Sequence, residues 1–88
     1  MKAFILYRRD SEFGRRTEEY VHDYQRTRNE TLEMMDVDTV EGTTQAELYG
    51  IVAYPTLLII REDNQLLKDW QGVENFPLMN ELAAYLAS

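Results

Sequence analysis

The chain contains no cysteine among its 88 residues. This absence excludes a disulfide framework, a thiolate zinc site and thiol–disulfide chemistry, and it suits a reducing compartment, so we expect a cytoplasmic protein. Glycine and proline are also scarce, at four and two residues, and the chain has no repeat or low-complexity tract. Such a composition disfavours disorder and indicates a folded, cysteine-free domain.

No apolar run in the sequence is long enough to cross a membrane. The first run, from Ala3 to Tyr7, is far shorter than the ~18 residues that a spanning helix needs, and basic residues follow it. We therefore expect this run to be a buried strand, and we expect neither a signal peptide nor a membrane partner. Hydrophobic residues make up 44% of the chain, which is enough for one small domain over residues 1–88.

Basic residues are scarce in the last two thirds of the chain. Residues 29–88 carry two basic and eleven acidic residues, a net charge of −9, whereas residues 1–28 have a net charge of +2. The total of −7 disfavours nucleic acid as a partner. Four arginines flank residues 10–14, in a pattern that fits a solvent-exposed helix face with pairs such as Glu12–Arg16.

Apolar periodicity predicts one long helix after the first strand. The residues that share its inward face are Phe13, Thr17, Tyr20, Val21 and Tyr24. Asp10 or Ser11 can cap the start of this helix, because a short side-chain oxygen accepts an unpaired helix N–H.

The remaining pattern predicts strands over residues 2–7, 32–37, 56–60 and 65–71. A short helix over residues 45–49 and a last helix with Pro77 in its first turn complete the order β-α-β-α-β-β-α. The first βαβ unit should be parallel, and the last two strands should form a hairpin. We therefore predict an α/β fold in which helices cover both faces of a four-stranded mixed sheet.

The most specific pattern lies between Asp36 and Gly72. The segments that carry it are Asp36-Val37-Asp38, Tyr49-Gly50-Ile51, Tyr54-Pro55-Thr56-Leu57-Leu58 and the Gly72 that follows the hairpin. In these segments the chain resembles the thioredoxin-like superfamily, and its four-strand minimum is closest in size to glutaredoxin. The resemblance implies that Pro55 is the cis proline of a substrate-binding loop.

The first half departs from that family in every feature that thiol chemistry needs. Ser11-Glu12-Phe13-Gly14 takes the place of the Cys-x-x-Cys motif, with Ser11 at the nucleophilic position. The first strand lacks the family's buried acid, and Met34 stands where the family has a lysine. The resemblance therefore implies a non-redox member without disulfide reductase activity. A second interpretation stays open, in which Ser11 replaces a cysteine of a monothiol redox protein.

Other catalytic and metal chemistry finds little support in the sequence, and we expect no cofactor. A serine nucleophile needs a nearby base, and His22 is eleven residues from Ser11, roughly 16 Å along a helix. His22 has no companion ligands at suitable spacing, and the acidic residues Asp36, Asp38 and Glu41 do not form a closed cation-binding loop. Trp70 is either a core residue or a protein-contact residue.

One group of residues supports a binding hypothesis. Its members are Arg8, Arg9, Ser11, Phe13, Tyr54, Pro55 and Thr56. The loop backbone can pair with an extended peptide as an added strand, and the arginines favour an anionic group such as glutathione or an acidic peptide. We expect a monomeric module that binds a peptide or protein; a glutathione-binding, transferase-like enzyme and a dimerising structural domain are the alternatives.

Overall fold

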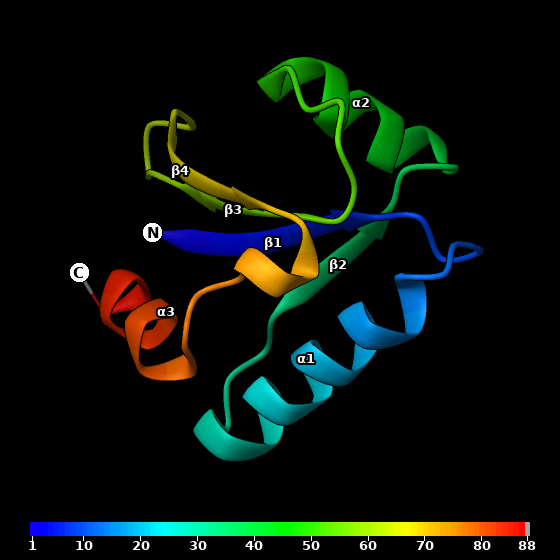
Figure 1. Cartoon of the computed structure of the whole chain (residues 1–88). Helices are drawn as coiled ribbons and strands as arrows, with labels where there is room; N and C mark the ends of the chain where they lie inside the picture. Colours follow the sequence, from blue (N-terminus) through cyan, green and yellow to red (C-terminus); the bar gives the residue numbers. More distant parts are fainter. Residues whose placement is uncertain (88) are drawn as a thin grey trace.

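A computed structural model describes residues 1–87 (Figure 1). In chain order its elements are β1 (Lys2–Tyr7), α1 (Gly14–Arg28), β2 (Glu33–Asp36), α2 (Val40–Tyr49), β3 (Thr56–Ile60), β4 (Leu66–Gln71), the 3-10 turn η1 (Val73–Asn75) and α3 (Met79–Leu86). The expected order is confirmed, and η1 is the one element that the sequence did not indicate.

The four strands form a single mixed sheet in the order β2-β1-β3-β4. β1 is parallel to β2 and antiparallel to β3, and β3 and β4 form an antiparallel hairpin. β1 and β3 are therefore central and have neighbours on both sides. This position explains why both are continuous apolar runs, since each must be buried on its two faces.

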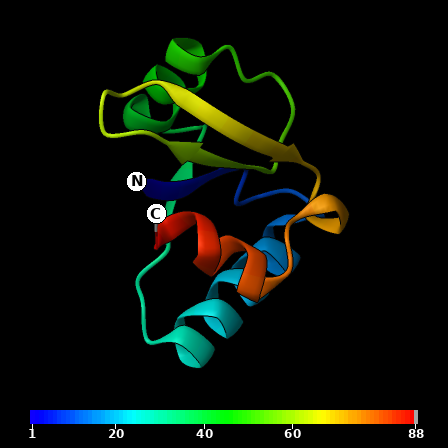
Figure 2. The same ribbon diagram turned by 90° about the vertical axis from the view of Figure 1, so that its left-hand side faces the viewer.

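Helices cover both faces of the sheet, as expected (Figures 1 and 2). α1 and α3 lie on one face and α2 lies on the other. Because successive strand residues point to opposite faces, β1 and β3 supply both cores. Ile5, Leu57 and Ile59 pack on the side of α1 and α3, and Leu6 and Leu58 pack on the side of α2.

Trp70 of β4 extends the first of these cores toward the sheet edge. It is half-buried, packs against the core cluster and meets Tyr85 of α3 edge-on, with ring centroids 5.6 Å apart. The core interpretation of Trp70 is therefore the one that the structure supports. Among residues 1–87, no helix has the length and apolar character needed to cross a membrane.

The starts of the helices differ from those expected. Neither Asp10 nor Ser11 caps α1, which begins at Gly14 after an Asp10–Phe13 turn, and its N-cap residue Phe13 makes no side-chain capping bond. The exposed ion pairs of this helix are Arg15–Glu19 and Arg26–Asp23 rather than Glu12–Arg16, because Glu12 precedes the helix.

α2 begins five residues earlier than expected, at Val40. The Thr39 hydroxyl accepts the Gly42 amide at 3.1 Å and caps the helix. Gly42 lies inside α2, at a position where a Cβ would overlap the backbone of Asp36. The close approach of α2 to the end of β2 therefore requires a glycine here. α3 begins at Met79, so Pro77 precedes the helix instead of lying in its first turn. The Pro77 carbonyl accepts a hydrogen bond from the Tyr20 hydroxyl at 2.8 Å.

Candidate functional site

The loop that connects α2 to β3 is anchored at Ile51. The Ile51 amide donates to the Ala46 carbonyl at 2.8 Å, and the Ile51 side chain is only 6% exposed. The next residue, Val52, is 88% exposed although it is apolar. The Tyr54–Pro55 peptide bond is cis, as the family resemblance implied. Two consecutive residues of this loop thus differ sharply, since Ile51 is a buried anchor and Val52 is an exposed apolar residue.

Three hydrogen bonds fix the shape of this loop. Thr56 Oγ1 donates to the Ala53 carbonyl at 2.6 Å, and the Tyr54 hydroxyl donates to the Ile51 carbonyl at 3.1 Å. From the far side, the Gly72 amide donates to the Pro55 carbonyl at 2.8 Å. Thr56 is fully buried, so it shapes the loop from inside and does not reach a ligand.

The backbone of Tyr54 is left open by these bonds. Within residues 1–87, neither the N–H nor the C=O of Tyr54 has a hydrogen-bond partner. An unpaired backbone donor and acceptor on one residue are what an added strand needs for pairing. The loop therefore presents a short, fixed and unpaired backbone edge.

Tyr54 lies between two surface hollows. The Phe13 hollow, of about 260 Å³, is lined by Phe13, Ala53, Tyr54, Pro55, Gln71, Gly72 and Glu74. The Val52 hollow, of about 360 Å³, is lined by Arg8, Val37, Thr43, Ala46, Glu47, Gly50, Ile51, Val52 and Tyr54. A segment that pairs with the Tyr54 backbone could therefore place side chains in a hollow on either side.

The arginines that the sequence grouped are separated in the structure. Arg8 borders the Val52 hollow, where its guanidinium lies 5.9 Å from the centre of the Tyr54 ring and its Nε lies 3.4 Å from Asp38 Oδ1. The charge of Arg8 is thus largely compensated, although a pair this exposed contributes little stability. Arg9 is exposed and lines neither hollow.

Ser11 also lines neither hollow. Its hydroxyl donates to the Arg8 carbonyl at 2.7 Å, which ties the turn before α1 to the end of β1. His22 lies in an exposed hollow of α1 with Arg15, Glu18 and Asp23, away from Ser11. Residues 1–87 contain no group of three His, Asp or Glu side chains that could hold a metal ion.

The resolved pKa shifts belong to tyrosines and all point upward. Burial raises the pKa of Tyr7, with a further contribution from nearby Glu18. Burial also raises the pKa of Tyr20 to about 12, and burial together with the hydrogen bond to Glu30 raises the pKa of Tyr24 to about 12. These phenols therefore stay neutral at physiological pH and do not act as bases.

The structure brings together only part of the group of residues proposed from the sequence. Phe13, Tyr54 and Pro55 do lie together, but Glu47 of α2 and the Gln71–Glu74 segment were not anticipated. The one signal in the sequence for that segment was Gly72, which follows the hairpin and resembles the family in that position.

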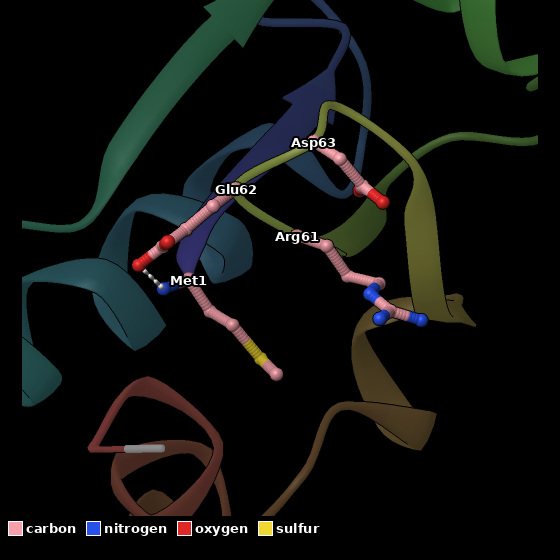
Figure 3. A pocket seen from close by; sticks show the side chains of 4 residues that line it. All are labelled: Met1, Arg61, Glu62 and Asp63. Carbon is pink, nitrogen blue, oxygen red and sulfur yellow. Dashed lines mark ion pairs between the residues drawn. The ribbon is translucent and has the colours of Figure 1, made fainter.

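Another hollow, of about 300 Å³, lies at the opposite end of the central strands (Figure 3). Met1, Arg61, Glu62 and Asp63 line it, and the Met1 ammonium lies 4.0 Å from Glu62 Oε1. Lys2 pairs with Ile60 at this end, whereas Leu6 pairs with Thr56 at the Tyr54 end. Because the Glu62 side chain is 93% exposed, this ion pair is weak and the hollow offers no comparable site.

Comparison with solved structures places the chain in the thioredoxin-like fold class. Thioredoxin 1 from Thermosipho africanus superposes with a TM-score of 0.70 at 17% identity, over 99% of this chain and 96% of that protein. The germline-specific thioredoxin Deadhead from Drosophila melanogaster gives 0.64 at 23% identity, over 98% and 79%. Thioredoxin f2 in complex with ferredoxin:thioredoxin reductase appears in a structure that gives 0.54 at 20% identity, over 98% and 76%.

The fold of this chain is thus that of thioredoxin, without the Cys-x-x-Cys motif. No protein-family model matches the sequence, and comparison with curated proteins finds no match. Identities this low carry the architecture and not the activity. The function must therefore be argued from the site itself.

Proposed function

We propose that this chain is a non-redox binding module, which takes up an extended segment of a partner protein at the Tyr54–Pro55 loop. The observation that carries the proposal is the unpaired backbone of Tyr54 on a loop whose shape is fixed by hydrogen bonds on either side of that residue. An extended segment that donates to the Tyr54 carbonyl and accepts from its amide gains main-chain affinity without any sequence requirement.

The surroundings of the loop support this use. The anchor at Ile51 and the internal Thr56–Ala53 bond hold the edge in one shape before a partner arrives. A preformed edge binds more tightly than a mobile one, because less conformational entropy is lost on association. Val52 and the Phe13 hollow add apolar surface on either side of the edge.

The absence of cysteine makes this binding non-covalent. Thioredoxin-type exchange requires a thiolate, and this chain has none. Ser11 lines neither hollow, which leaves no hydroxyl from the motif position beside a bound segment. The glutathione-using enzyme, the structural dimer and the cytoplasmic location stay predictions.

A matched pair of variants tests the role of the backbone. Tyr54→Pro removes both the ring and the amide hydrogen, whereas Tyr54→Ala removes the ring alone. The probe is an array of immobilised nine-residue peptides of random sequence, from which the best binder is then measured free in solution. Because Tyr54→Pro loses one hydrogen bond more than Tyr54→Ala, its affinity for the peptide should be roughly 3–10-fold lower than that of Tyr54→Ala.

Chemical-shift mapping with the same peptide locates the contact. Residues 8–14, 52–56 and 71–74 should shift first in the isotope-labelled protein. Shifts confined to residues 61–64, or equal affinities of the two Tyr54 variants, would show that the segment binds elsewhere.

A further inference from the structure

The charges that face Tyr54 are mostly negative. Arg8 is the single cation among the residues that line the two hollows, and Asp38 lies 3.4 Å from it. Glu47 and Glu74 each line one hollow, and neither has an ion-pair partner within residues 1–87. A bound segment therefore meets two uncompensated carboxylates and one compensated guanidinium.

Glu74 has the better-placed carboxylate of the two. Its side chain folds back over the preceding turn, such that a Cβ added to Gly72 would lie 2.6 Å from Glu74 Oε1. Gly72 in turn donates its amide to the Pro55 carbonyl. The carboxylate thus lies beside Gly72, and Glu74 lines the Phe13 hollow together with Tyr54 and Pro55.

The Phe13 hollow also has no cation of its own. Arg8 borders the Val52 hollow only, so a positive side chain near Glu47 would meet Arg8 as well, whereas one near Glu74 would not. Residues 29–88 carry two basic residues, and both lie away from the loop. Arg61 is at the opposite end of β3, and Lys68 lies over the Trp70 ring at 5.4 Å.

We infer that the segment bound at this loop is basic: a Lys or Arg pairs with Glu74, and a neighbouring apolar side chain enters the Phe13 hollow. This inference rests on the proposed function and adds the chemical class of the partner. The acidic residues after position 28 act in the same direction, since a net negative surface attracts a basic segment over a distance. The acidic peptide that the sequence suggested is the opposite outcome.

The peptide array provides the first test. Each of the nine positions is fixed in turn as Lys, Arg, Gln or Glu while the others are random. Lys or Arg should exceed Glu by at least about threefold at one position, as a charge-assisted bond at a partly exposed site implies. The signal of the basic peptides should fall between 50 and 300 mM salt.

Carboxylate variants provide the second test, with the strongest basic peptide and its Lys→Gln version as free probes. Glu74→Gln should weaken the basic peptide by roughly 3–10-fold and leave the Lys→Gln peptide unchanged. Glu47→Gln should have a smaller effect. Glu33→Gln is the matched control, because it removes one exposed carboxylate from β2, at the other edge of the sheet, and should change neither affinity.

The possible results separate the two proposals. Equal selection of Lys, Gln and Glu with shifts at residues 52–56 would overturn the inference and keep the binding module. Selection of Glu, lost in Arg8→Gln or Arg9→Gln, would overturn it in favour of an acidic partner. Both proposals would be overturned by an array without signal, or by peptide affinities that Tyr54→Pro leaves unchanged.

Discussion

The two connections of β3 differ in what fixes their shape and in the side chains that they expose. Three hydrogen bonds within the turn after β3 fix its shape: the Arg61 amide donates to the Gln65 carbonyl, the Asn64 amide to the Arg61 carbonyl, and the Gln65 amide to Asp63 Oδ1. The loop before β3 leaves the Tyr54 backbone open. The turn is polar and exposed, whereas the loop places Val52 in solvent.

This difference supports the function proposed for the loop before β3. A connection that only reverses the chain is closed by short-range hydrogen bonds and shows polar side chains, as residues 61–65 do. A connection that is held rigidly and yet left unpaired has surface that a partner can complete. The four predictions that follow test this contrast, from the largest expected effect to the smallest.

Ile51→Ala should have the largest effect on folding. Ile51 is 6% exposed and belongs to the core between the sheet and α2. Removing its buried methyl groups should lower the free energy of unfolding by about 2–5 kcal/mol, measured by urea denaturation. Val52→Ala is the neighbouring control, and it should change stability by less than about 0.5 kcal/mol because Val52 is exposed. Similar losses of stability in both variants would contradict the assignment of Ile51 as the buried anchor and of Val52 as an exposed residue.

Thr56→Val should have the next largest effect. The substitution keeps the side-chain shape but removes the buried hydroxyl that donates to the Ala53 carbonyl. We expect a loss of about 1–3 kcal/mol, because the carbonyl of the half-buried Ala53 loses its partner. Asp63→Ala removes an exposed bond of the turn and should cost about 0.5 kcal/mol or less. The contrast fails if the turn variant is the less stable of the two.

High pH should weaken the contact between α1 and the connection from η1 to α3. Tyr20 donates to the Pro77 carbonyl, and its burial raises its pKa to about 12 from the ordinary value of 10. The neutral phenol therefore adds stability that is complete below about pH 10 and is lost as the pH rises toward 12.

Tyr20→Phe should accordingly be less stable than the natural chain at pH 8, and the difference should shrink by pH 12. Urea unfolding at pH 8, 10, 11 and 12 measures this change. Tyr24→Phe should behave similarly, since the Tyr24 pKa is also about 12. A deficit that stays constant over the whole range would contradict the assignment.

The smallest perturbation is to exchange hydrogen for deuterium. The Tyr54 amide has no partner within residues 1–87, so it should exchange faster than the Arg61 amide, which donates to Gln65 at 2.9 Å. Residue-resolved exchange at neutral pH measures both rates in one sample. After a bound peptide is added, the Tyr54 amide should slow and the Arg61 amide should not.

The sequence predicted the central strands well because their signal is local. Residues 2–7 and 56–60 are unbroken apolar runs, and burial on both faces is the condition that such runs satisfy. The starts of the helices were harder to predict from the sequence. Gly42 precedes the short helix expected over residues 45–49, yet it lies inside α2. The Asp36 backbone approaches it so closely that only glycine fits, a contact that no local pattern reveals.

Only half of the candidate site could be predicted from the sequence, for the same reason. Tyr54 and Pro55 are adjacent in sequence and signalled a loop, whereas Glu74 reaches them only through the hairpin that brings Gly72 against Pro55. The placement of Arg8 beside Asp38 likewise depends on the parallel pairing of β1 with β2. The arginines grouped with the loop from the sequence therefore suggested an acidic ligand. The charged residues that line the two hollows in the structure suggest a basic one.

The step from buried Ile51 to exposed Val52 has a consequence for how such a domain can evolve. The residues that fix the loop, Ile51 and Thr56, are inside the molecule, while Val52 and Glu74 face solvent. Exposed positions change at little thermodynamic cost. In the proposed binding module, substitutions at Val52 and Glu74 can therefore alter the choice of partner while the scaffold stays folded, so affinity and stability can be selected independently.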